Sequence, residues 1–526
     1  MEKKIKSFII LSICIIIGII VGLGIVHKDE LSDKSKKNDV IKEENISLLI
    51  IEPDFLNPLV SQNKYVQQVS KLVFDGLTKL DSKLKPNLVL AKTFIPDNTL
   101  TRWTVSLRDD VLFHDGSKFT ADDVIFTINK IKELEDKSYY LYNVANISSL
   151  TKVSEYELVI NLEKSDNFLM SKMDIPILSK SYYENKSLEH TDRYIGTGIY
   201  KQTDFNKTSM SLVAFSDYYR EVTGNIKNID IKIIEKARPG FELLKVGEVD
   251  VADTSTDVGA YGRSAYNSKK YVTGIFEGII FNPENEVLKD ITLREAILLG
   301  INRDLIIEEY LGGYGVSTDL PVNPNSYLVN NELTKKSFNP EYAQDILTNN
   351  GFKDNIALGF RTKNENKLQF NLLINKDREN AEKKAQFIKR DLKNIGIDIK
   401  VIAKSTTDYN TAIAKKEYDL ALTDWIISEY PEFLYSFDSN SKDNIFGFSN
   451  EDYDYYVFMA KTEYLEGRLT EYFRKMQEIL IREFPIIGLY FETSTVYYNK
   501  DIEGEFYSTK NDIYSGIENM MRIRNR

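Results

Sequence analysis

Cysteine and histidine are scarce in this sequence. Its 526 residues include one cysteine, Cys14, and three histidines. A single cysteine excludes an internal disulfide framework and a metal site built from cysteines. Three histidines are also a small supply for metal ligation or general-base chemistry. We therefore predict that the chain holds no metal ion and no cofactor.

An excess of basic residues is lacking too, because the formal net charge is -11. A protein that binds nucleic acid must neutralise phosphates with lysine and arginine, so this charge argues against nucleic acid as a partner. The hydrophobic content of 42% and the charged content of 28% are ordinary for a folded body.

Motifs of common enzyme classes are absent as well. No H-E-x-x-H, G-x-S-x-G, G-x-x-x-x-G-K or C-x-x-C pattern occurs in the chain. Without a nucleophile and base in view, we predict no catalytic residues and no enzymatic activity. A membrane-anchored enzyme is the weaker alternative, which turnover of a peptide by the ectodomain would support.

The chain has one long apolar run, at its amino terminus. Residues 8–26 carry no charge and follow three lysines within residues 1–6. In a helix this run spans about 28 Å, close to the hydrocarbon thickness of a bilayer. We predict that residues 1–26 are a retained membrane anchor with the body outside, and that the charged residues 27–44 are a flexible tether. A cleaved signal peptide, or a degenerate lipobox at Cys14, is the alternative.

The body is longer than one hydrophobic core usually organises, so two or three lobes are expected. Its most specific segment, residues 107–127, reads LRDDVLFHDGSKFTADDVIFT. Just upstream, residues 103–107 alternate apolar and polar side chains as a half-buried strand does. Residues 114–117 are turn formers, and Thr120 can cap a helix whose apolar residues recur at helical spacing. The pattern predicts a strand, a turn and a helix.

This segment closely resembles the signature of family 5 extracytoplasmic solute-binding proteins, the peptide and nickel receptors of ABC importers. Further blocks resemble the family in the same order, with mild departures at Asn57, Ile199, Tyr219 and Asn302. About eight blocks in order over some four hundred residues are far more specific than any one motif. The further blocks are EPDFLNP at 52–58, FDGL at 74–77, GTGIY at 196–200, DYY at 217–219, GEVD at 247–250, FN at 281–282, LREA at 293–296 and INR at 301–303.

The resemblance implies an α/β, two-lobed periplasmic-binding-protein-like fold of type II, cluster C. An extra domain is inserted early, and the amino-terminal transmembrane helix precedes the body. Carried onto this chain, lobe I comprises residues 45–75, 190–275 and 490–526, the inserted domain residues 76–189, and lobe II residues 276–489.

Local patterns in lobe II agree with an α/β fold. Residues 368–374 form an apolar, strand-like run, and apolar residues then recur at helical spacing until Gly396, which is placed to end that helix. Residues 397–401 alternate as a strand does, which predicts a β-α-β unit with a right-handed crossover. A short helix near residues 408–415 leads to another strand, residues 418–423.

A ligand site is expected beyond the end of the strand at residues 418–423, because ligands of open α/β sheets bind there. Trp425 stands just past it. In peptide-binding members this region resembles W-x-x-D-Y-x-(D/E)-P, whose aspartate pairs with a ligand's α-ammonium. Counting from Trp425 puts Ser428 in the acidic place, whereas aligning on Tyr430 puts Glu429 there. We favour Glu429, because a buried ammonium needs an opposing charge. Alternatively, Trp425 is a core aromatic and Glu429 a solvated loop residue.

The second candidate region is the loop formed by Ser61, Gln62 and Asn63. Family geometry implies that its backbone runs along one edge of an extended ligand. Backbone pairing of that kind supplies affinity without demanding a particular side chain. A polar surface loop is the alternative interpretation.

The resemblance thus implies a receptor that captures a peptide outside the cell between two closing lobes. It would deliver the peptide to the permease and ATPase subunits of an ABC importer. We expect a monomer, held at the cell membrane of a bacterium of Gram-positive type by its amino-terminal helix. Alternatively, the same fold binds a nickel chelate, haem, a sugar or a signalling peptide. A stand-alone sensor is a weaker alternative, because about six residues inside the cell are too few for a signalling domain.

Overall fold

The computed structural model of the chain describes residues 40–190, 193–236, 239–333, 335–355 and 359–525. The predicted membrane anchor, residues 1–26, and residues 27–39 of the predicted tether lie outside these ranges. Within the described ranges, no helix is long and apolar enough to cross a membrane. The tether was predicted to reach residue 44, but Val40–Glu43 form strand β1, which pairs with the carboxyl-terminal strand β23.

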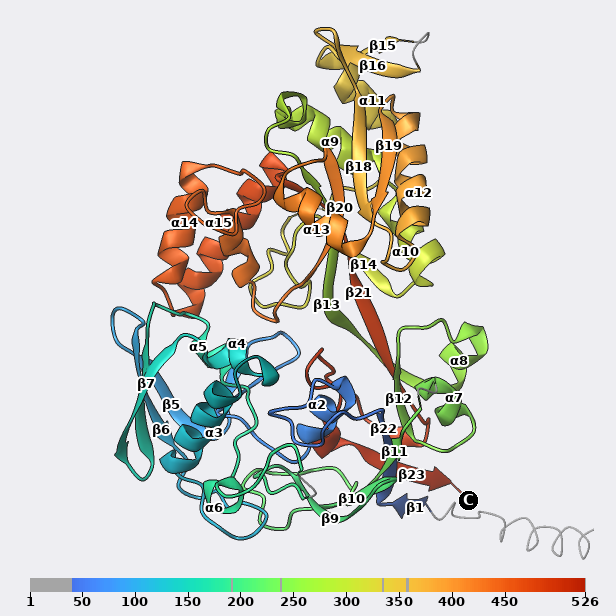
Figure 1. Cartoon of the computed structure of the whole chain (residues 1–526). Coiled ribbons are helices and arrows are strands. Elements are labelled where there is room, and N and C mark those ends of the chain that lie inside the picture. The colour runs from blue at the N-terminus through green and yellow to red at the C-terminus, as the bar shows by residue number, and fades with distance from the viewer. Residues whose placement is uncertain (1–39, 191–192, 237–238, 334, 356–358, 526) are drawn as a thin grey trace, which may run out of the picture.

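Lobe I is built on a four-stranded sheet of order β2-β11-β10-β9, in which β2 and β11 are parallel and the other pairs antiparallel. A second sheet, β1-β23-β22, joins the beginning of the described chain to its carboxyl end, and both sheets lie in the lower part of Figure 1. The elements of lobe I are β1 (Val40–Glu43), β2 (Asn45–Ile51), α2 (Lys64–Ser70), β9 (Tyr200–Asn206), β10 (Ser209–Ala214), β11 (Asn228–Ile234), α7 (Gly240–Lys245), β12 (Val251–Thr254), α8 (Gly259–Ala265), β22 (Ile502–Glu503) and β23 (Met521–Asn525).

The inserted region contributes a four-stranded antiparallel sheet of order β5-β6-β8-β7, with helix α3 packed against β7. The predicted strand, turn and helix are confirmed here: Thr120 caps α3 in a capping box with Asp123. The elements are β3 (Thr78–Leu80), β4 (Pro86–Leu88), β5 (Ala91–Pro96), β6 (Arg102–Leu107), α3 (Ala121–Leu134), α4 (Leu141–Val144), β7 (Ile147–Ser154), β8 (Glu157–Leu162), α5 (Leu169–Lys172) and α6 (Lys180–Tyr183).

A seven-stranded mixed sheet of order β12-β21-β13-β20-β18-β19, with β14 beside β21, begins in lobe I at β12 and organises lobe II; its two longest strands are β13 (Asn267–Phe281) and β21 (Ile486–Tyr498). Strand β18 is parallel to β19 and to β20. The remaining elements are α9 (Ile291–Gly300), α10 (Arg303–Leu311), β14 (Gly315–Ser317), α11 (Pro340–Asn349), β15 (Lys353–Asn355), β16 (Phe360–Lys363), β17 (Asn366–Lys367), β18 (Gln369–Asn375), α12 (Ala381–Asn394), β19 (Asp398–Lys404), α13 (Thr406–Ala414), β20 (Leu420–Ile426), η3 (Glu432–Phe437), α14 (Glu451–Lys461) and α15 (Glu466–Glu483).

The predicted β-α-β unit is confirmed as β18, α12 and β19. Gly396 follows the helix with φ of +84°, a conformation that glycine adopts without strain. The next strand was predicted to end at residue 423, but β20 continues to Ile426 because Trp425 pairs in register with Phe276 of the neighbouring strand. The tryptophan therefore lies inside the strand.

Two long strands connect the lobes. β13 (Asn267–Phe281) and β21 (Ile486–Tyr498) run side by side from lobe I into lobe II (Figure 1). Their register shifts between Val272 and Phe276, and Gly274 in this gap has φ of +88°. An irregular point of this kind is where two lobes can change their relative angle with little cost to the ladder.

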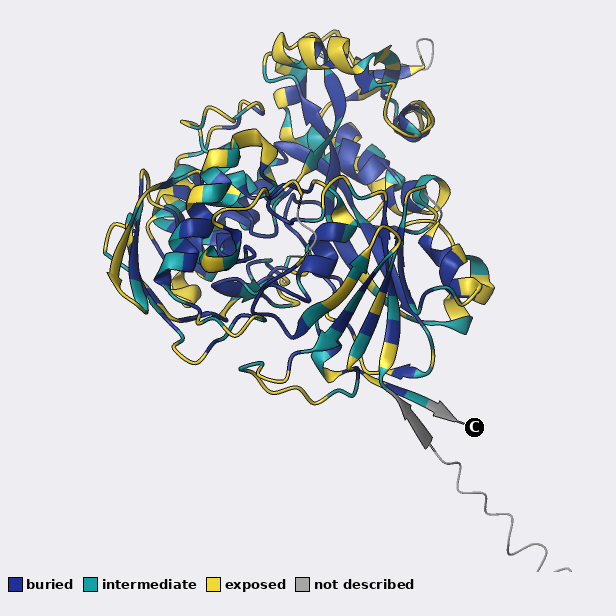
Figure 2. Cartoon of the chain, turned by 60° about the horizontal axis from the view of Figure 1, so that its bottom comes forward, coloured by how far each residue is buried: buried dark blue, intermediate teal, exposed yellow. Residues whose placement is uncertain are grey.

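Buried residues run through the interior of both lobes, and exposed residues lie on the outer helices and loops (Figure 2). One apolar core joins lobe I to the inserted region and includes Leu48 and Trp103. Lobe II has two cores on opposite faces of its sheet, since Leu372 and Ile374 belong to one and Leu373 to the other. The cavity described next lies where these parts meet.

Candidate ligand-binding site

A cavity of about 930 Å³ lies between the lobes. Its walls come from α2 and the residue after it, from residues 139–143 and α5 of the inserted region, from residues 425–436 and 441–446 of lobe II, and from residues 510–511 of the carboxyl-terminal loop. This volume is at the upper end of the range usual for small-ligand pockets, roughly 300–1,000 Å³. The cavity is large enough for a ligand of several residues.

Trp425 lines the cavity and also packs among aromatic rings. Its indole stacks on Phe276 with 5.7 Å between ring centroids and meets the edge of Phe433 at 5.6 Å. Half-buried in this way, the ring is fixed in orientation and still presents one side to the cavity. The binding and packing interpretations of Trp425 are thus compatible.

Glu429 is buried, with 7% of its surface exposed. Its Oε2 accepts a hydrogen bond from the Asn511 side chain at 2.6 Å, while Oε1 is buried with no hydrogen-bond partner among the residues that the structure describes. Burial, followed by the negative charge of Asp174, raises the pKa of Glu429, and Lys510 and Lys71 offset part of that rise. The alternative of a solvated loop carboxylate is therefore wrong, because this side chain is an under-compensated charge in the cavity wall.

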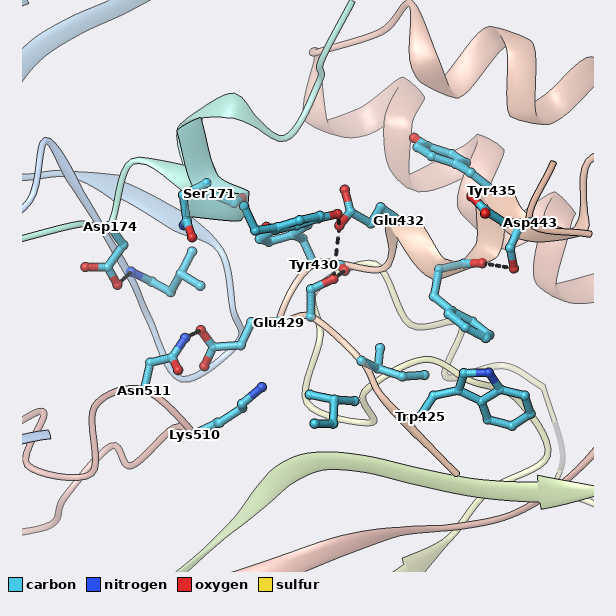
Figure 3. A pocket seen from close by; sticks show the side chains of 18 of the residues that line it. Ser171, Asp174, Trp425, Glu429, Tyr430, Glu432, Tyr435, Asp443, Lys510 and Asn511 are labelled. Carbon is cyan, nitrogen blue, oxygen red and sulfur yellow. Dashed lines mark hydrogen bonds between the residues drawn. The ribbon is translucent and has the colours of Figure 1, made fainter. Parts of the chain in front are cut away.

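Other charges gather at the same end of the cavity. Lys71, the C-cap residue of α2, forms an ion pair with Asp174 at 2.6 Å, and their side chains are only 8% and 13% exposed. Lys510 lines the cavity beside Glu429. Figure 3 shows Asp174, Asn511, Glu429 and Lys510 together at one end, and Trp425 at the other.

Ser428 and Tyr430 line the cavity on either side of Glu429. The Ser428 hydroxyl donates to the backbone oxygen of Tyr430 at 2.9 Å, so it shapes the turn. Tyr430 is 7% exposed, and its ring stacks on Phe168 of the inserted region at 5.4 Å. Of the two aligned residues, Glu429 brings a carboxylate to the cavity wall and Ser428 brings a hydroxyl that is already bonded to the turn, and contact of either with a ligand stays a prediction.

The inserted region contacts lobe II along one side of the cavity. Phe168 is 2% exposed and belongs to a lobe II core, where it also meets the edge of Phe473 at 5.8 Å. Lys172 forms an ion pair with Glu432 at 3.3 Å, and Tyr142 donates to the same carboxylate. These contacts hold the cavity wall of the inserted region against that of lobe II.

Ser61, Gln62 and Asn63 do not line this cavity. The Ser61 hydroxyl donates to Asp54 at 2.5 Å. The Asn63 side chain caps α2, because it accepts from the backbone N–H groups of the first turn and donates to the Ile51 carbonyl at 2.8 Å. The structure gives these residues a local role, and their contact with a ligand stays a prediction.

Several residues that build the site were missed by sequence reasoning. Lys510 and Asn511 come from a carboxyl-terminal loop with no motif of its own, so no local signal marks them. Lys71 and Asp174 are joined only by the fold. The run of tyrosines at 139, 140 and 142 was the one visible signal, because closely spaced tyrosines often line recognition surfaces.

A two-lobed α/β fold with a ligand-sized cavity between its lobes defines a solute-binding protein. Residues 83–445 match the family model described as bacterial extracellular solute-binding proteins, family 5 Middle. The chain belongs to this family. Among the described residues, no group of three or more His, Cys, Asp or Glu side chains is placed to hold a metal ion.

Individual relatives are distant but match over nearly their whole length. The oligopeptide-binding protein AppA of Bacillus subtilis is 24% identical, over 98% of each chain. The periplasmic murein tripeptide binding protein MppA in its unliganded open form matches with a TM-score of 0.80 at 20% identity, covering 92% of this chain and 99% of its own. A nickel ABC transporter structure from Bacillus halodurans gives a TM-score of 0.79 at 16% identity, covering 91% and 100%. These structures confirm the two-lobed fold.

Proposed function

We propose that this protein captures a peptide in the cavity between its lobes and delivers it to the permease and ATPase subunits of an ABC importer. The observation that carries this proposal is the buried Glu429 carboxylate, whose Oε1 has no hydrogen-bond partner within the described part of the chain. A buried acceptor of this kind costs free energy unless a ligand donates to it. The α-ammonium of a peptide is a donor of the right charge.

The rest of the cavity suits a peptide with varied side chains. Tyr139, Tyr142, Trp425 and Phe433 provide broad apolar walls, which accept side chains of different shapes. Charged residues of both signs line the two ends, so the cavity matches a ligand that is itself zwitterionic. The names of the relatives, among them oligopeptide-binding and dipeptide-binding proteins, support the same ligand class.

We also propose the arrangement of the chain at the membrane. Residues 1–26 anchor the protein and the body faces outside, in keeping with a family of extracellular solute-binding proteins. Lobe I is proposed as residues 45–75, 190–275 and 490–526, the inserted domain as 76–189 and lobe II as 276–489, in a type II, cluster C arrangement. Release of the protein from washed membranes by detergent, but not by alkaline carbonate, would support a retained anchor.

Binding and release leave the ligand chemically unchanged in this proposal, so no catalytic step is assigned. The test is calorimetric titration of the full chain, in detergent, with peptides of two to nine residues, nickel with histidine, haem, and oligosaccharides. Saturable binding of peptides alone is the expected result. Binding of one of the other ligands without binding of any peptide would overturn the proposal.

A further inference from the structure

The ammonium group of Lys510 faces the cavity next to Glu429. Among the residues that the structure describes, no hydrogen-bond or ion-pair partner of Lys510 lies within 4.0 Å of its Nζ. Figure 3 draws its side chain beside Glu429 without a dashed line, whereas Glu429 is joined to Asn511. Lys71 differs, because its ion pair with Asp174 at 2.6 Å satisfies both charges. Lys510 and Glu429 are thus left as two opposite charges that share one end of the cavity without touching.

The Lys510 side chain lies against Gly274, where strand β13 passes between the lobes. A Cβ placed on Gly274 of β13 would lie 3.2 Å from Cδ and 3.4 Å from Nζ of Lys510. Gly274 therefore leaves the room that this side chain occupies. Its carbonyl accepts the backbone N–H of Ile427 at 2.8 Å, which ties the loop of Glu429 to the same point. The Lys510 side chain and the loop that carries Glu429 therefore meet at Gly274.

From this placement we infer that Glu429 and Lys510 together bind one terminal ligand residue that carries an ammonium and a carboxylate. The inference rests on the proposed peptide binding and deepens it. Glu429 accepts from the ammonium, and Lys510 donates to the carboxylate. The shared chemistry occurs in a peptide that begins with aspartate or glutamate, and in one that begins with a γ-linked glutamate.

Repulsion strengthens this selectivity. A peptide with a neutral first residue would place its α-ammonium beside Glu429 and near the Lys510 ammonium, without a carboxylate to pair with Lys510. The two positive charges repel each other at short range, which opposes binding. Burial lowers the pKa of Lys510, while Glu429 acts in the opposite direction, as expected for a cation with too little compensation. A carboxylate on the first residue supplies that compensation.

The test is calorimetric titration of the full chain with peptides Xaa-Ala-Phe-Ala, in which Xaa is alanine, aspartate, glutamate or γ-linked glutamate. We expect the wild-type protein to bind at least one acidic-first peptide about tenfold more tightly than the alanine-first peptide. The aspartate, glutamate and γ-linked arms show which source of the carboxylate fits. Lys510→Met and Lys510→Gln should each reduce this ratio to about one, and Lys510→Arg should keep it.

Lys461→Met is the matched control, because Lys461 lines the same cavity but pairs with Asp438 at 3.6 Å. This variant should keep the preference. A wild-type protein without the preference, or a preference that survives in both Lys510→Met and Lys510→Gln, would overturn the inference while leaving peptide binding intact. Absence of binding to all four peptides would instead overturn the proposed function, and this inference with it.

Discussion

Asn511 donates its side-chain amide to Oε2 of Glu429 at 2.6 Å, and so joins the carboxyl-terminal loop of lobe I to the loop that follows β20 in lobe II. The bond fixes the direction of the carboxylate. The Asn511 amide satisfies only one oxygen, so Oε1 stays buried without a hydrogen-bond partner in the described ranges of the chain. The cavity wall thus presents a carboxylate oxygen that can accept a further hydrogen bond.

Glu429→Gln should weaken peptide binding. The substitution keeps the size of the side chain and an oxygen for Asn511, but it removes the charge that opposes the ligand's ammonium. We expect a loss of about 2 kcal/mol, or roughly 30-fold in affinity, measured by calorimetric titration. Glu184→Gln is the matched control, because Glu184 is exposed and lies outside the cavity lining. Equal affinity of the wild-type and Glu429→Gln proteins would contradict the site.

The same substitution should stabilise the ligand-free protein. Burial raises the pKa of Glu429, so the folded state favours the neutral form and keeping the charge at neutral pH costs stability. Glu429→Gln removes this cost, and its midpoint of thermal unfolding without ligand should rise by roughly 1–2 °C. A lower midpoint would show that the carboxylate stabilises the fold and was not retained for a ligand.

Phe168→Ala should shift the protein toward an open form. Phe168 reaches from the inserted region into a core of lobe II and stacks on Tyr430 at 5.4 Å. Its loss removes packing that holds the inserted region against lobe II, so we expect a larger radius of gyration by small-angle scattering and about tenfold weaker peptide binding. Phe458→Ala, at a phenylalanine that is 65% exposed, is the control. Unchanged scattering and affinity in Phe168→Ala would contradict this role.

His114 should make the stability of the fold depend on pH. Burial lowers the pKa of His114 from 6.5 to about 4, and its Nε2 lies 2.9 Å from the carbonyl oxygen of Gly198. Below pH 6.5 the His114 side chain binds a proton in the unfolded chain, whereas in the folded chain it stays neutral until about pH 4. The free energy of unfolding therefore falls through this window as the pH falls.

We expect the free energy of unfolding to fall by about 2 kcal/mol more between pH 7 and pH 5 in the wild type than in His114→Gln, measured by urea denaturation. The exposed His190 serves as the control, since His190→Gln should keep the wild-type difference. A His114→Gln protein that loses as much stability on acidification as the wild type would refute the assignment.

The fold was largely predictable because its signals are local. The cap at Thr120 and the periodicities on both sides of α12 depend on neighbours in the sequence, and the structure confirms them. Trp425 was predicted to lie beyond the end of the strand, but it lies inside β20. The length of β20 depends on pairing with Phe276, which is distant in sequence.

The site was predictable only in part, for the same physical reason. Glu429 was found because a recognisable block surrounds it. Its partner Asn511 lies 82 residues away, and no sequence pattern near either residue predicts their hydrogen bond. Asn63 caps helix α2 through its side chain, a role that the sequence analysis did not assign to it.

Native mass spectrometry of the purified protein tests the central claim most directly. The wild-type and Glu429→Gln proteins should be isolated in parallel, and the ligands that dissociate on activation should be sequenced. We predict that the wild type carries short peptides and that Glu429→Gln carries far fewer. A non-peptide ligand at full occupancy, or equal peptide occupancy in the two proteins, would contradict the claim that this cavity captures peptides through Glu429.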